Sequence, residues 1–133
     1  MLNIASKGRL PKTLTLAKRY FATLTNGAYK DIIFKNEISV VREDDVRFPV
    51  NELSTGTMEQ LYLALIMSMA VGFSDQYPMP IMIDDGFVNF DQSRRHAANQ
   101  MLKQVSEQTQ VLYFTANLER EFDAGTVLDL GKL

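Results

Sequence analysis

Residues 53–65 read LSTGTMEQLYLAL, and residues 80–85 read PIMIDD. The first stretch is a Ser-Thr-Gly turn that opens an apolar helix, which we expect to run from Thr57 to about residue 73. Thr57 and Gln60 fit a capping box at its start, in which each side chain satisfies a backbone N–H group of the other. The helix is apolar on nearly all sides, so it should be the central buried helix. The second stretch is a short apolar strand of the kind that parallel sheets bury, and it ends in two carboxylates.

The rest of the chain alternates between helical and extended patterns. Pro11 suits the first position of a helix over residues 11–24, because its missing N–H group would be unpaired there anyway, and Asn26-Gly27 is a stop signal. Asp91 can cap a third helix that runs to about residue 107. This order predicts the α/β class, with parallel strands flanked by helices and a small antiparallel hairpin. Strands are expected at residues 29–34, 37–41, 111–114 and 127–130, with a charged loop at residues 42–45.

The composition is that of one ordinary globular domain, which we assign to residues 1–133. The net charge is −2, so no global basic field points to nucleic acid. There is no cysteine, which excludes disulfides and thiolate metal sites and fits a reducing compartment such as the cytoplasm. The first residues lack the apolar core of a signal peptide, and no apolar run is long enough for a membrane span, so we expect no membrane partner.

Ser54, Thr55 and Gly56 have two interpretations. A serine hydroxyl beside a glycine at a helix N-terminus makes an anion site, because the free N–H groups point outward and glycine lets a phosphate approach the backbone. The same three residues are also an ordinary helix cap, which serine and threonine supply in many proteins.

Asp84 and Asp85, taken alone, also have two interpretations. A strand that ends in a carboxylate can hold Mg²⁺, and a second carboxylate can orient an attacking water. Alternatively, Asp85-Gly86 between two apolar runs is a strong signal for a β-hairpin turn. The sole histidine, His96, and its neighbours Arg94 and Arg95 lie on a polar helix face and are expected to be solvated surface residues.

Two further stretches follow in order: residues 87–91 read FVNFD, and residues 110–117 read QVLYFTAN. With the two opening stretches they resemble the signature motif, Walker B strand, D-loop and switch strand of the SMC, RecN and SbcC-like branch of ABC-type ATPases. The Walker A pattern G-x-x-x-x-G-K-[ST] is not present in this sequence. The resemblance implies that the chain is the C-terminal half of a P-loop ABC ATPase head, with the Walker A lobe elsewhere in a larger parent.

The resemblance also implies a role for each motif residue. The signature residues Ser54, Thr55 and Gly56 would contact the γ-phosphate of a nucleotide held on a second head. Asp84 would position Mg²⁺ and Asp85 the attacking water, with Asn117 at the position of the switch histidine. Asn89 and Asp91 would belong to the D-loop along the dimer seam. The implied cofactors are ATP and Mg²⁺.

Three positions depart from the pattern of the family. Asn117 replaces histidine and cannot carry charge or shuttle a proton. Asp85 stands where most relatives have glutamate, and Ile66 stands where the signature helix commonly has arginine. Two functions therefore remain open: a lobe of an ATPase, inactive when alone because Walker A is absent, or a degenerate head that dimerises as a nucleotide-gated or structural module without turnover.

The partners that the resemblance implies belong to the parent protein. They are the N-terminal Walker A lobe of the same parent, a second head in a homodimer, and DNA and a nuclease reached through the parent. In such a machine ATP binding closes the heads and hydrolysis releases them, and a coiled coil passes that motion to DNA. The helix at residues 11–24 and the hairpin after it resemble the stretch where the coiled coil re-enters the head.

Overall fold

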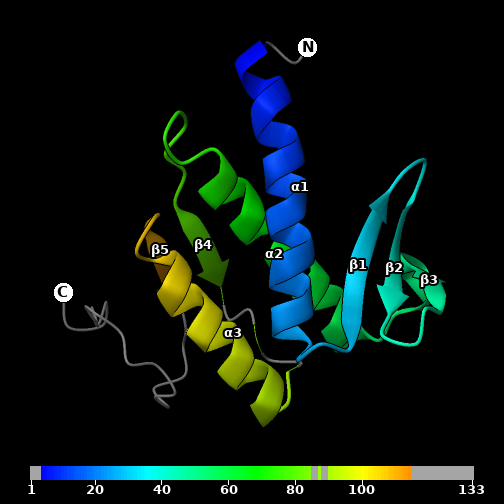
Figure 1. Cartoon of the computed structure of the whole chain (residues 1–133). Coiled ribbons are helices and arrows are strands. Elements are labelled where there is room, and N and C mark those ends of the chain that lie inside the picture. The colour runs from blue at the N-terminus through cyan, green and yellow to red at the C-terminus, as the bar shows by residue number, and fades with distance from the viewer. Residues whose placement is uncertain (1–3, 85–86, 88–89, 115–133) are drawn as a thin grey trace.

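The computed structural model describes residues 4–84, 87 and 90–114 (Figure 1). The predicted strand at residues 127–130 therefore lies outside the described residues. The elements are three helices, five strands and one 3-10 turn: α1 (Ile4–Leu24), β1 (Tyr29–Phe34), β2 (Ile38–Arg42), β3 (Arg47–Pro49), η1 (Val50–Glu52), α2 (Thr55–Gly72), β4 (Ile81–Asp84), α3 (Gln92–Val105) and β5 (Val111–Phe114).

The strands form two separate sheets in the described part of the chain. β4 and β5 pair in parallel, with Ile81 opposite Val111 and Asp84 opposite Phe114. β1, β2 and β3 form an antiparallel sheet in that order. The α/β class with a parallel pair and a small antiparallel hairpin is confirmed. The charged loop expected at residues 42–45 lies one residue later, at residues 43–46, because β2 extends through Arg42 and β3, which pairs with β2, begins at Arg47.

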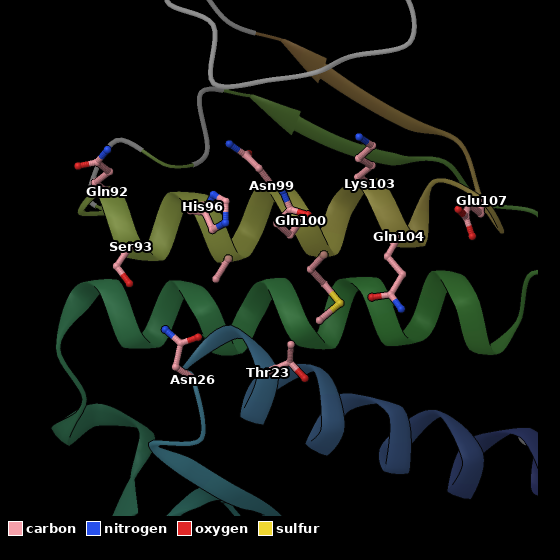
Figure 2. Close-up of a pocket in the computed structure, with 12 residues that line it drawn as sticks. Thr23, Asn26, Gln92, Ser93, His96, Asn99, Gln100, Lys103, Gln104 and Glu107 are labelled. Carbon is pink, nitrogen blue, oxygen red and sulfur yellow. The ribbon is translucent and has the colours of Figure 1, made fainter.

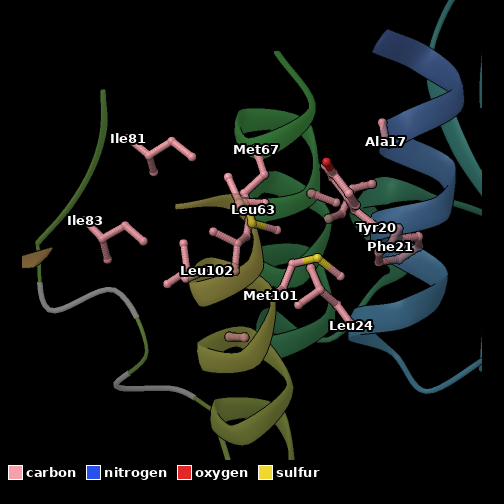
Figure 3. Close-up of a cluster of buried hydrophobic side chains, with 14 of the residues drawn as sticks. Ala17, Tyr20, Phe21, Leu24, Leu63, Met67, Ile81, Ile83, Met101 and Leu102 are labelled. Carbon is pink, nitrogen blue, oxygen red and sulfur yellow. The ribbon is translucent and has the colours of Figure 1, made fainter. Parts of the chain in front are cut away.

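The core lies between the three helices and one face of β4 (Figure 3), and the antiparallel sheet adds Ile32 and Val40 to it. Ile81 and Ile83 alternate with exposed Met82 and Asp84, so one face of the strand is buried and the other is open. Figure 3 shows the two isoleucines on the side of β4 that faces α2 and α3, with α1 on the far side of α2. The buried residues with the least exposure include Ala17, Phe21, Leu61, Ala64, Met67 and Ala98.

α2 is central, as predicted, since it contacts α1, α3 and β4. It is not buried on all sides, however. Tyr62, Ile66 and Met69 are 50, 51 and 52% exposed, and their spacing places them on one stripe of the helix. The sequence, which is apolar on nearly all sides, predicted a buried helix, and no element among the described residues covers this stripe.

The first helix starts earlier than the sequence suggested. α1 begins at Ile4, so Pro11 lies inside the helix rather than at its first position. Proline has a helical φ, but inside a helix it removes one backbone hydrogen bond and crowds the carbonyl group four residues earlier. α1 continues through Pro11 nonetheless, at a position where Leu10, Pro11 and Lys12 are exposed. The predicted end is confirmed, because Asn26 and Gly27 have φ values of 53° and 82°, which no helix continues. In Figure 1 the N-terminal end of α1 extends beyond the other elements.

Candidate functional site

Ser54 is the residue that starts α2. Its backbone is extended, and its Oγ accepts a hydrogen bond of 3.2 Å from the Thr57 N–H group. The Ser54 hydroxyl in turn donates to Thr57 Oγ1 at 2.9 Å. The predicted capping box at Thr57 and Gln60 is therefore wrong by one turn. Ser54 accepts the Thr57 N–H group, which the predicted box had assigned to the Gln60 side chain. Gln60 turns inward to α1 instead.

The first turn of α2 is open to solvent on one side. Ser54 and Thr55 are exposed, whereas Gly56 is buried. The first N–H groups of a helix have no partner within it, and no acidic side chain lies in this first turn. The turn therefore has the chemistry of an anion site as well as that of a cap.

Arg94 of α3 covers the buried side of this turn. Its Nη2 donates to Thr57 Oγ1 at 3.4 Å, across 37 residues of sequence. A Cβ atom on Gly56 would lie 3.0 Å from Arg94 Nη1 and 3.2 Å from Arg94 Cζ. The prediction that Arg94 is a solvated surface charge is therefore wrong, because its side chain is only 34% exposed and packs on α2.

Asp91 connects the predicted D-loop to the same arginine. It is the N-cap of α3, as predicted, and its Oδ1 accepts the Arg94 N–H group at 2.8 Å. Its Oδ2 lies 3.6 Å from Arg94 Nη1. The structure thus brings Asp91, Gly56 and Thr57 around one guanidinium group, with Asp91 and Gly56 near Nη1 and Thr57 at Nη2.

Asp84 is the last residue of β4 and is exposed. The carboxyl end of β4 and the N-terminal ends of α2 and α3 all lie toward the lower end of the molecule in Figure 1. Asp85, Asn89 and Asn117 lie outside the described residues. Within the described part, no group of three or more acidic, histidine or cysteine residues is arranged to hold a metal ion.

A groove of about 1060 Å³ lies between α3 and the end of α1 (Figure 2). Thr23 and Asn26 line it from the α1 side, and His96, Asn99 and Gln100 line it from α3. None of the predicted site residues that the structure describes lines it. His96 is exposed there, which confirms the prediction of a solvated histidine. Among the described helices, none is both long and apolar enough to cross a membrane.

Comparison with known proteins identifies the fold. No family model matches the chain. The chain is 38% identical to the uncharacterised protein YhaN of Bacillus subtilis (strain 168) over 115 residues, which make up 84% of this chain and 12% of YhaN. A structure described for ATP-driven dimerisation and DNA-stimulated activation of SMC ATPases matches with a TM-score of 0.68 at 15% identity, over 86% of this chain and 73% of that one. The Smc head domain of Pyrococcus yayanosii, which carries a coiled coil and joint, matches with a TM-score of 0.67 at 17% identity, over 81% of this chain and 22% of that one.

This chain has the fold of an SMC-like ATPase head. It spans a small part of YhaN and of the Pyrococcus chain, so it corresponds to a fragment of those proteins. The described residues of this chain fit Mg²⁺ in one respect. Mg²⁺ in nucleotide sites is held by one or two carboxylates together with phosphate oxygens and water, and the exposed Asp84 supplies one such carboxylate.

Proposed function

We propose that residues 1–133 are the C-terminal lobe of an SMC-like ATPase head, and that the parent protein binds and hydrolyses ATP between two such heads to drive DNA repair or DNA maintenance. The observation that carries this proposal is the open first turn of α2. Ser54 and Thr55 are exposed there, at a helix N-terminus whose N–H groups and dipole favour a phosphate.

In this proposal the lobe supplies half of each nucleotide site. Ser54, Thr55 and Gly56 contact the γ-phosphate of ATP held by Walker A of the second head. Asp84 holds Mg²⁺, Asp85 orients the attacking water, and Asn117 donates a hydrogen bond to the water or to the γ-phosphate. Mg²⁺, when bound, neutralises negative charge on the phosphates as they separate. Asn89 and Asp91 lie along the seam between the heads.

The proposed partners include the lobe that carries Walker A, a motif that is not present in this sequence. The N-terminal Walker A lobe of the parent completes the head, and a second head completes the dimer. α1 fits the helix that leads back from a coiled coil, because its N-terminal end extends beyond the other elements (Figure 1) and the matching Pyrococcus head carries a coiled coil. DNA and a nuclease are reached through the parent in the cytoplasm. The lobe by itself hydrolyses no ATP, since phosphoryl transfer depends on positioning by both halves.

A second function is favoured by two residues that depart from the pattern of the family, Asn117 and Asp85. Asn117 cannot shuttle a proton as histidine does, and Asp85 is one methylene shorter than glutamate. A head with these residues can still close around ATP. It would then serve as a nucleotide-gated dimerisation module without turnover.

Steady-state ATP turnover by the full-length parent tests the proposal. We expect Asp85→Asn and Ser54→Arg each to abolish turnover, while Gln100→Arg, which adds the same charge at an exposed position of α3, leaves it unchanged. ATP-dependent dimerisation is measured on the same proteins. Dimers without turnover in the wild type support the second function. A parent with neither turnover nor ATP-dependent dimers refutes both.

A further inference from the structure

We infer that Arg94 is a positioning residue that fixes the signature turn of α2 relative to the D-loop aspartate, so that the two segments move as one unit. This inference rests on the proposed function, because it concerns how the proposed nucleotide site is held in shape. Arg94 belongs to none of the motifs that the sequence singled out.

A continuous chain of contacts links the two segments. Asp91 Oδ2 lies 3.6 Å from Arg94 Nη1, and Arg94 Nη2 lies 3.4 Å from Thr57 Oγ1. Thr57 Oγ1 in turn accepts the hydroxyl of Ser54 at 2.9 Å. The Ser54 hydroxyl that would face the γ-phosphate is therefore oriented by a threonine whose other contact is Arg94. A shift of Asp91 is passed to Ser54 through two side chains.

The shape of the site is consistent with this role. Gly56 leaves just enough room for the guanidinium group, since a Cβ atom would be 3.0 Å from Nη1. The planar guanidinium has donors on more than one edge, so it can contact Asp91 and Thr57 at once. A lysine ammonium is a single point charge and cannot make both contacts in the same geometry.

The electrostatics favour a role beyond packing. Arg94 places a positive charge beside the N-terminal ends of α2 and α3, where helix dipoles disfavour cations. Asp91 offsets part of this cost, and it is itself 63% exposed. An anion in front of Ser54 would offset the remaining unfavourable interaction between the Arg94 charge and the helix dipoles. The arrangement is therefore expected to be tightest when a phosphate is bound, which is when positioning matters for catalysis.

The test compares Arg94→Gln, Arg94→Lys and Asp91→Asn in the full-length parent. Lys103→Gln is the matched control, because it removes a positive charge from an exposed position of the same helix. We expect Arg94→Gln to lower kcat by about tenfold or more, because small misplacements of a catalytic site have effects of this size. The ATP concentration for half-maximal turnover should change little, since Walker A of the other head holds the nucleotide. Arg94→Lys should recover only part of kcat, and the double variant Arg94→Gln/Asp91→Asn should be no slower than the slower single variant.

The outcomes separate this inference from the proposed function. Turnover that survives Arg94→Gln while Ser54→Arg abolishes it overturns the inference and leaves the proposed function standing. A loss that follows only a lower thermal midpoint, with kcat per folded protein unchanged, shows that Arg94 is merely structural and also overturns it. If the wild type dimerises with ATP but does not turn over, the yield of ATP-dependent dimer replaces kcat as the measure. A wild type with neither property overturns both proposals.

Discussion

The side-chain amide of Gln60 in α2 donates a 2.8 Å hydrogen bond to the backbone carbonyl of Leu24, the last residue of α1. Both residues are 1% exposed. The last carbonyl groups of a helix have no partner within it, and water does not reach this one. Gln60 therefore caps the C-terminal end of α1 from a position 36 residues further along the chain.

Replacing Gln60 by leucine should destabilise the chain. The change keeps much of the side-chain volume but leaves the buried Leu24 carbonyl without a donor, which costs about 1–3 kcal/mol. Gln60→Glu should cost more, because a carboxylate cannot donate and would be buried as a charge. Urea denaturation measures both variants, with Gln100→Leu at an exposed position as the control. A Gln60→Leu variant as stable as the control would contradict the assignment.

Gly72 lies at a close approach of α2 to α1. A Cβ atom on Gly72 would overlap Thr13 Oγ1 and lie 3.1 Å from Thr13 Cβ. We expect Gly72→Ala to cost about 1–3 kcal/mol, as overpacking of a core usually does. Thr13→Ala should recover most of that loss, because it removes the overlapping hydroxyl, which is buried and has no hydrogen-bond partner among the described residues.

A double-mutant cycle by thermal unfolding checks this pair. The two changes should be strongly non-additive, since neighbouring residues in contact couple. If the costs of Gly72→Ala and Thr13→Ala simply add, the two helices do not meet at this point.

The elements that the sequence predicted well are those set by local pattern. The apolar run of α2, the cap at Asp91 and the position of β4 each depend on residues close together in the sequence. The exposure of Met82 on the open face of β4 was not predicted, because the strand was expected to be buried. Local pattern misplaced the start of α1, because Pro11 suits a first helical position but lies inside this helix. It also missed β3, which has only three residues and is held by pairing with β2.

At the candidate site the sequence carries signals for the helix caps but not for the contacts between the helices. Ser54 and Asp91 have recognisable sequence signals as helix caps. The contact of Arg94 with Thr57 crosses 37 residues, and no spacing rule reaches that far. Gly56 offered one clue, since a glycine just inside a helix signals that something approaches the backbone closely.

The pKa of Asp44 should depend on Arg42. Two hydrogen bonds of 2.9 and 2.7 Å from the Arg42 guanidinium lower the pKa of the Asp44 carboxyl from 3.8 to about 2. Because the folded pKa is the lower one, the stabilisation is fully present above pH 3.8 and is lost as the pH falls through about 2. Arg42→Gln should raise the pKa toward its ordinary value, which an NMR titration of the carboxyl measures. An unchanged titration would show that the pair does not form in solution.

The exposed stripe of α2 should make the isolated chain self-associate. Tyr62, Ile66 and Met69 present neighbouring apolar side chains that nothing in the described chain covers, and such patches favour association. Ile66→Glu should shift the chain toward monomer in analytical ultracentrifugation. Met79→Glu, at an exposed methionine outside α2, is the matched control. Equal association of both variants and the wild type would assign the contact to another surface.

The two roles of Ser54 can be separated by substitution. Ser54→Ala removes the cap and should cost about 1 kcal/mol of stability. Ser54→Asp keeps a side chain that accepts from the Thr57 N–H group, so the stability of the chain should stay near that of the wild type. In the parent, however, the new carboxylate would face the γ-phosphate and repel it, so turnover should be lost. Chemical denaturation of the chain and ATP turnover of the parent, measured side by side, check the pair. A parent in which Ser54→Asp is as active as wild type would leave Ser54 with the role of a helix cap alone.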